Sequence, residues 1–144
     1  MDSLTTFLAL WGAVVSTIAI GWHIWRDLLD RGKLRVICYV GELVGGSGPP
    51  DPTPKLVYNV TNTGRRPILV THIGGAFAKD RQFMVPMRGQ MPRMLQPGEY
   101  LLEYSKDLSV LDEKPTALFA IDSLGKHWKV PRKQLQYLLR QHQS

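Results

Sequence analysis

The residues that could do chemistry in this 144-residue chain are few and scattered. No second histidine or cysteine stands at metal-ligand spacing from any of the four histidines, which are His23, His72, His127 and His142. The single cysteine, Cys38, is a small residue on an alternating stretch, so we expect it to be buried and inert. A Gly-x-Ser-x-Gly motif and a phosphate-binding glycine loop are both missing from the sequence. We therefore expect that the protein is not an enzyme and that it binds neither a cofactor nor a metal.

Residues suited to binding are more prominent, and the clearest segment runs from Phe83 to Met94. It contains four of the five methionines, interleaved with arginines, and methionine adapts readily to irregular apolar surfaces. Two interpretations stay open: the segment contacts a partner or lipid headgroups, or its methionines close one end of a β-domain. With a neighbouring arginine pair, it supplies the residues expected to contact a partner or lipid: Arg65, Arg66, Met87, Arg88, Met91 and Arg93.

The formal net charge is +6, and the basic residues fall into three groups. The first lies between residues 26 and 35, the second is formed by the four arginines just named, and the third comprises Lys126, Lys129, Arg132, Lys133 and Arg140. Such charge suits contact with an anionic membrane surface, or it simply keeps the protein soluble. Nucleic acid is not expected as a partner, because no nucleic-acid-binding motif accompanies the charge.

The elements that must position these residues begin with an uncharged run from Leu4 to Trp25. As a helix the run is about 33 Å long, enough for a bilayer core of roughly 30 Å. A buried helix of a soluble protein would show charges along one face, and a cleaved export signal would begin with basic residues, whereas this chain begins with Asp2. We predict a retained span, with residues 1–31 forming a transmembrane helix and its juxtamembrane extension.

Orientation follows from the Lys and Arg residues beside the run, which all lie on its C-terminal side. The positive-inside rule then predicts a single-pass inner-membrane protein with its N-terminus outside and everything after Trp25 in the cytoplasm. The single cysteine agrees with this orientation, because it allows no internal disulfide. One feature opposes it: Asn59-Val60-Thr61 fits the N-glycosylation pattern.

The predicted span has two different faces. Tryptophans gather on one side, and small residues gather on the other, together with one histidine: Ala9, Gly12, Ala13, Ser16, Ala19 and His23. Small residues let two helices approach closely in lipid, so we expect a homo-oligomer held together through this face. Small residues are also common in spans that do not associate. His23 either shares a polar seam with Asp27 or simply meets the headgroups.

After Gly32 the apolar pattern changes to period two, which is typical of strands. Turn signals at short intervals predict one antiparallel β-sandwich over residues 34–131, close to the membrane because no long linker precedes it. Pro131 opens a basic amphipathic helix over 132–144. The expected strands are Leu34–Gly41, Lys55–Asn62, Pro67–Gly74, Gln82–Val85, Glu99–Ser105, Thr116–Asp122 and His127–Val130, with a loop over Gly45–Pro54.

Three stretches carry a resemblance to a known group: "VYNVTNTGRRPILVTHIG", "LQPGEYLLEY" and "TALFAIDSLGKHWKVP". They resemble Ig-like β-sandwich domains of small bacterial membrane proteins that have one N-terminal span and mostly no assigned function. The resemblance implies a mainly β fold: an N-terminal transmembrane helix, an Ig-like antiparallel β-sandwich and a short C-terminal helix. Its motifs mark turns and strand starts, so it implies no catalytic residues.

These features predict a membrane-anchored binding or adaptor module, with its sandwich presented to the cytoplasm near the inner leaflet. The expected partners are membrane lipids, further copies of the chain and a cytoplasmic protein that the sequence does not identify. An alternative from a different class is an oligomeric membrane effector, such as a toxin or a defence protein. In it the spans would open or disrupt the bilayer under control of the sandwich.

Overall fold

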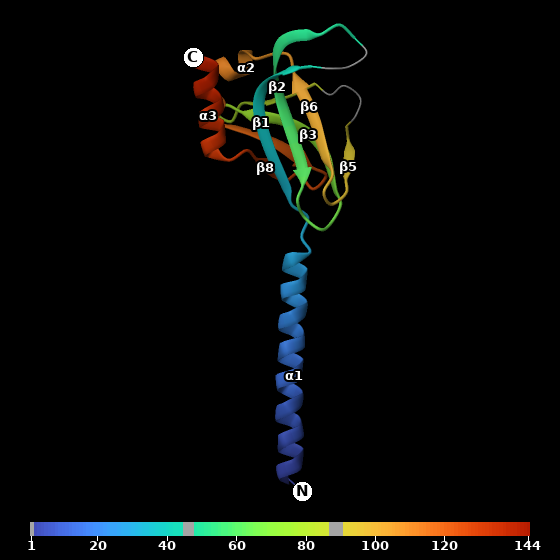
Figure 1. The fold of residues 1–144 in the computed structure, drawn as a ribbon. Helices are drawn as coiled ribbons and strands as arrows, with labels where there is room; N and C mark the ends of the chain where they lie inside the picture. The colour runs from blue at the N-terminus through green and yellow to red at the C-terminus, as the bar shows by residue number, and fades with distance from the viewer. Residues whose placement is uncertain (1, 45–47, 87–90) are drawn as a thin grey trace. The chain divides into compact units, whose positions relative to one another are not determined.

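The structure is a computed structural model, and it describes residues 2–44, 48–86 and 91–144 (Figure 1). The chain divides into two compact units, Met1–Arg31 and Gly32–Ser144, and each is described by itself. We call the second unit the β domain.

The first unit is one helix, α1, which spans Asp2–Leu29. A single helix cannot bury its own surface, and none of its residues is buried. Three of its hydroxyl groups bond within the helix: Thr6 donates to the Asp2 carbonyl, Ser16 to the Gly12 carbonyl and Thr17 to the Ala13 carbonyl, each at 2.8 Å. The prediction of a helix within residues 1–31 is confirmed. The helix is long and apolar enough to cross a membrane, properties that an export signal and a core helix of a soluble protein also have.

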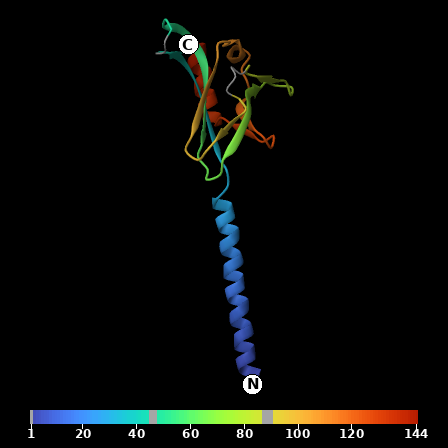
Figure 2. The same cartoon turned by 90° about the vertical axis from the view of Figure 1, so that its right-hand side faces the viewer.

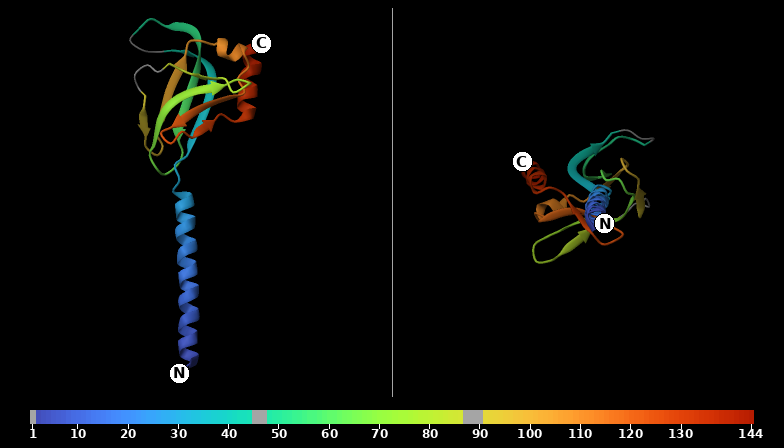
Figure 3. Two further views of the ribbon diagram at one scale, coloured as in Figure 1. Left: turned by 180° about the vertical axis from the view of Figure 1, so that it is seen from behind. Right: turned by 90° about the horizontal axis from the view of Figure 1, so that it is seen from below.

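The β domain contains two antiparallel sheets. The first has the order β1-β2-β6, with β1 at Leu34–Leu43, β2 at Asp51–Asn62 and β6 at Tyr100–Ser105. The second has the order β4-β3-β7-β8, and β5 pairs with the other half of the β3 edge that β4 occupies. Its strands are β3 (Ile68–Ala76), β4 (Gln82–Met84), β5 (Arg93–Leu95), β7 (Ala117–Asp122) and β8 (His127–Lys129). Figures 2 and 3 show the two layers from the side and from behind.

Alternation along the strands builds one core between the sheets. Every second residue of the long strands points inward and is buried there, as along β1, β2 and β7: Leu34, Val36 and Cys38; Leu56, Tyr58 and Val60; Leu118 and Ala120. The C-terminal helix α3, Arg132–Gln143, adds Leu135 and Leu138 to the same core. A short helix, α2, spans Ser109–Asp112 and adds Leu111.

The two lateral sides of the β domain are closed differently. Helix α3 packs beside β1 and β7 on one side. On the opposite side, where β5 lies, β6 is the edge strand of its sheet (Figures 1 and 3). Among the described strands β6 pairs with β2 alone. Within the described residues, the side bounded by β6, β4 and β5 is therefore not covered by α3, and only the short helix α2 lies beside it, after the end of β6.

Most predicted strands are confirmed within two residues, and the C-terminal helix after Pro131 is confirmed. The loop predicted over Gly45–Pro54 is wrong at its end, because β2 already begins at Asp51. Pro52 and Pro54 lie beyond the last pair of β2 with β6, which is Leu56 with Ser105. The N–H groups that proline lacks would have faced that unpaired side, so the strand tolerates both prolines.

Candidate binding site

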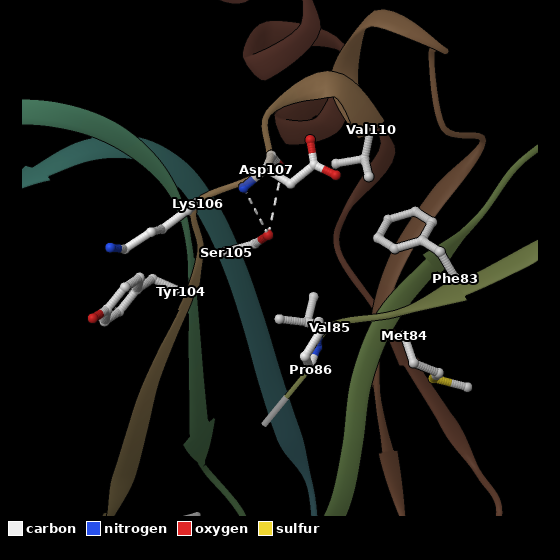
Figure 4. A pocket seen from close by; sticks show the side chains of 9 residues that line it. All are labelled: Phe83, Met84, Val85, Pro86, Tyr104, Ser105, Lys106, Asp107 and Val110. Carbon is white, nitrogen blue, oxygen red and sulfur yellow. Dashed lines mark hydrogen bonds between the residues drawn. The ribbon is translucent and has the colours of Figure 1, made fainter. Parts of the chain in front are cut away.

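A groove of about 480 Å³ lies at the uncovered side of the β domain, between β6 and β4. We call it the edge groove, and Figure 4 shows the nine side chains that line it. One wall is formed by β4 and the residues that follow it, and the other by the end of β6, the next loop and α2. The lining residues are Phe83, Met84, Val85, Pro86, Tyr104, Ser105, Lys106, Asp107 and Val110.

The groove has an apolar floor and a polar rim. Phe83 and Val110 approach from opposite walls, and both pack against the core of the domain (Figure 4). On the rim, the Ser105 hydroxyl accepts a hydrogen bond from the Asp107 N–H at 3.2 Å. The carboxylate of Asp107 accepts bonds from the hydroxyl and the N–H of Ser109, which hold its pKa below the usual range. Apolar surface beside a few fixed polar groups is typical of a site for an organic or peptide ligand.

A buried lysine adjoins the Tyr104 side of the groove. Lys55 is only 1% exposed, and its ammonium lies 5.8 Å from the centre of the Tyr104 ring. It donates to the Asp51 carboxylate at 2.7 Å and to the Thr53 carbonyl at 3.3 Å. The Lys55 hydrogen bond, followed by those from Thr53, holds the pKa of Asp51 well below its usual range. The end of β2 beside the groove is therefore stabilised by an ion pair with one buried partner.

The backbone of β6 offers hydrogen-bonding groups along the same side. The Asn62 N–H donates to the Glu99 carbonyl at 2.9 Å, so the paired residues 60 and 101, and then 58 and 103, also bond to each other. The intervening residues of β6 direct their N–H and C=O groups away from β2; these are Tyr100, Leu102 and Tyr104. Tyr100 and Leu102 are also 59% and 47% exposed. The strand can thus accept a further strand beside it.

A second cavity continues the edge groove along β6. It measures about 510 Å³ and is lined by Arg93, Gly98, Glu99, Tyr100 and Leu102. One predicted contact residue, Arg93, therefore lies beside the exposed part of β6. An arginine, two carbon-rich side chains and a carboxylate in one cavity suit a peptide better than a purely apolar ligand.

The structure locates four of the six predicted contact residues. Arg65 and Arg66 are exposed in the turn between β2 and β3. The buried Asn62 amide donates to the carbonyls of Arg66 and Leu95, at 2.8 and 2.9 Å, which ties this turn to β5. Met91 is half-buried against the core, as in the interpretation that the methionines close one end of the domain. The predictions for Met87 and Arg88 lie outside the described residues.

The side chains of the predicted helix-packing face are all exposed on α1. A Cβ placed on Gly12 would meet no atom within 4 Å. The helix itself therefore does not require glycine at this position.

Sequence analysis missed Asp107 and Val110 as groove residues, because it did not predict α2. It also missed Tyr104, because the predicted strand that contains it gave no sign that β4 lies opposite. Asp107 and Ser109 are two residues apart and precede an apolar pair. An Asp whose carboxylate can accept a hydrogen bond from the backbone N–H two residues later is a turn signal. That signal could have located the start of α2 and the rim of the groove.

Other candidate chemistry has structural explanations. Burial raises the pKa of Cys38, so its thiol stays protonated at neutral pH. Burial alone would raise the pKa of Asp122, but hydrogen bonds from the Trp128 indole and from the N–H groups of Lys126 and Leu124 outweigh it and lower the pKa. Within the described parts of the chain, no three His, Cys, Asp or Glu side chains come together as metal ligands.

Comparisons with protein-family models, with characterised proteins and with solved structures found no match to this chain. The function argued below therefore rests on the residues and geometry of the chain itself.

The ion pair beside the groove gives a prediction about stability. We expect Asp51→Asn to destabilise the protein more than Lys55→Met, because the first change leaves a buried ammonium without its carboxylate and the second removes the charge but keeps the apolar stem. Denaturant unfolding of the full chain in detergent at pH 7 measures both. Equal losses, or a larger loss for Lys55→Met, would contradict this assignment.

The same pair predicts a pH dependence. The folded-state pKa of Asp51 lies below its unfolded value of about 3.9, so its contribution is fully present above that pH and is lost as pH falls through the folded pKa. The stability difference between the unmodified protein and Asp51→Asn should be constant from about pH 7 to 5 and should shrink below about pH 4.

Proposed function

We propose that this protein is a membrane-anchored binding module, in which α1 spans the inner membrane and an Ig-like sandwich binds an extended segment of a cytoplasmic protein along β6. The observation that carries the proposal is the uncovered side of the β domain. There an edge strand with outward-facing backbone groups adjoins two cavities, and each cavity is lined by both apolar and polar side chains.

The order of the strands supports the Ig-like assignment. In Ig domains the first, second and fifth strands share one sheet, and the third, sixth and seventh share the other. Here β1, β2 and β6 share one sheet, and β3, β7 and β8 share the other, with β4 added beside β3. With β5 set aside as a three-residue addition, these six strands correspond, whereas the fourth Ig strand, which lies beside the fifth in the first sheet, has no counterpart beside β6 among the described strands.

The charge pattern of α1 supports a span with a cytoplasmic β domain. No charged residue stands between Asp2 and Arg26, and basic residues follow only after that run. The opposing glycosylation pattern is weakened by its position. Asn59 lies on the central strand β2, where its side-chain oxygen accepts a hydrogen bond from Thr61 at 3.2 Å.

Orientation can be tested with single cysteines, because the native Cys38 is only 2% exposed and should not react. We expect a membrane-impermeant maleimide to label Ser3→Cys in intact spheroplasts, and to label Leu124→Cys only in inverted vesicles. Leu124 is 90% exposed in its turn, so failure to react would not reflect burial. Labelling of Leu124→Cys in intact spheroplasts would overturn the cytoplasmic assignment, and the unmodified protein provides the background.

Binding at the edge should depend on the backbone of β6. Leu102→Pro removes an N–H that the fold does not use, whereas Leu102→Ala removes the side chain and keeps the N–H. We place a photo-crosslinking amino acid at Met84, in the groove, and expect a discrete adduct in cells. Leu102→Pro should reduce that adduct about tenfold, and Leu102→Ala should reduce it much less.

Two controls accompany this experiment. The same photo-crosslinker at Leu124 should give no such adduct, and both Leu102 variants should unfold at temperatures close to that of the unmodified protein. Equal adduct yields from the two variants would exclude strand addition at β6.

We also propose that copies associate through the small face of α1: Ala9, Gly12, Ala13, Ser16, Ala19 and His23. The Ser16 hydroxyl is already bonded to the Gly12 carbonyl, so close packing there leaves no unsatisfied donor. Gly12 and Gly21 form a matched pair for testing this, since a Cβ at either meets nothing within 4 Å of the same chain, and they lie on opposite faces of the helix.

We expect Gly12→Ile to lower the crosslinked dimer fraction in liposomes about fivefold or more, and Gly21→Ile to leave it nearly unchanged. If the dimer fraction falls in both variants, or in neither, the small face of α1 is not the contact between copies. Release of trapped dye from the same liposomes distinguishes the membrane-effector alternative, for which oligomers would have to make the bilayer leak.

A further inference from the structure

We propose that a cavity on the outer face of the second sheet binds a phosphate-bearing ligand. The cavity measures about 490 Å³ and is separate from the edge groove, with which it shares no lining residue. We call it the cationic cavity. Its lining comes from β3, β4, β7 with the residue before it, β8 and the start of α3: Ala76, Gln82, Thr116, Ala117, Phe119, His127, Lys129 and Arg132.

The floor of the cationic cavity is aromatic. Leu118 and Ala120 of β7 point into the core, so Phe119 points to the outer face of the sheet. It is nevertheless only 1% exposed, and the His127 ring meets it edge-on with 4.6 Å between ring centres. Lys129 is the direct cross-strand neighbour of Phe119. A cation and a histidine are thus placed over an apolar base.

The charges around the cavity have one sign. Lys129, Arg132 and His127 line it, and the lining contains no carboxylate. Neither Lys129 nor Arg132 forms an ion pair with any side chain in the described ranges. The carboxylate nearest to Lys129 along the chain is Asp122, which already accepts hydrogen bonds from the Trp128 indole and from the N–H groups of Leu124 and Lys126. Glu113, the next nearest, pairs with Arg81. The cavity therefore lacks the counter-charge that a cluster of cations normally has.

The start of α3 adds to this positive field. Arg132 is the first residue of the helix, no acidic residue lies in the first turn, and Pro131 gives no side-chain cap. The first N–H groups of a helix lack intrahelical acceptors, and cations at that end oppose the helix dipole. An anion bound between Lys129 and Arg132 would offset both effects.

The number and type of these groups favour phosphate over a carboxylate. A phosphomonoester carries about two negative charges at neutral pH and matches the two fixed cations. The planar arginine fork binds phosphate oxygens in pairs, and the exposed Gln82 amide adds a neutral donor. A single carboxylate would leave one cation unneutralised.

The phosphate group could belong to a soluble compound or to a lipid headgroup, and the test separates the two. The ¹⁵N-labelled full chain is placed in nanodiscs of phosphatidylcholine and titrated with phenyl phosphate. In a second arm, phosphatidic acid replaces part of the phosphatidylcholine. We expect saturable amide shifts at His127, Lys129 and Arg132. Response to phenyl phosphate supports a soluble ligand, and response to phosphatidic acid alone supports a headgroup.

A charge-matched pair of variants tests the site itself. Lys129→Gln with Arg132→Gln should weaken binding about tenfold or more, since two charge-assisted contacts are lost. Lys79→Gln with Arg35→Gln removes the same charge from exposed positions outside both the edge groove and the cationic cavity, and should change binding less than about twofold. The charge-preserving pair Lys129→Arg with Arg132→Lys should retain most binding and guards against an effect of misfolding.

No shift with either probe, or equal weakening in both glutamine pairs, would overturn the proposal. The phenyl phosphate arm needs no protein partner and no peptide, so its result is independent of strand addition at β6. Failure of strand addition at β6 would leave the cationic cavity unaffected.

Discussion

The shared core between the two sheets determines which backbone edges of the β domain remain open. The inward residues of β1, β2 and β7 meet in one cluster, and Leu135 and Leu138 of α3 join it beside β1. Because α3 is fixed there by burial, it cannot also cover β6. An edge strand with unpaired N–H and C=O groups is a liability unless it is covered or used. Within the described residues, the position of the helix therefore leaves the edge of β6 in the first sheet without a helix along it that could block a further strand.

Buried polar side chains hold the turns that frame this core. The Asn62 amide donates to two carbonyls and accepts from the Gly64 N–H at 3.0 Å, so it links the β2–β3 turn to β5. The Asp122 carboxylate fixes the β7–β8 turn, because it accepts hydrogen bonds from the N–H groups of Leu124 and Lys126. An unpaired buried amide or carboxylate would be costly, and both are paired. Each turn, with the arginines and lysines on it, is thus held in a defined place.

Sequence patterns predicted the parts of the fold that depend on periodicity. The helix α1 and the long strands follow from runs of apolar residues with a clear period, and Leu135 and Leu138 are buried as the C-terminal pattern implies. Elements of three or four residues, β5 and α2, contain too few residues to show a period. The sequence therefore predicted only some of the residues that line the edge groove. Phe83 belongs to the methionine-rich segment, but Val110 reaches the groove through α2.

The two proposed sites differ in chemistry because they are built on different parts of the sheets. The edge groove uses an open backbone edge with apolar side chains, whereas the cationic cavity uses the outer face of β7 and β8 and the start of α3. A peptide strand and a phosphate group therefore need not compete. Only residues 30–33 separate α1 from β1. If α1 is held in a bilayer, so short a tether raises the effective concentration of any membrane ligand to the millimolar range. Modest intrinsic affinity for a membrane-borne ligand is then sufficient, which suits shallow, exposed cavities better than deep ones.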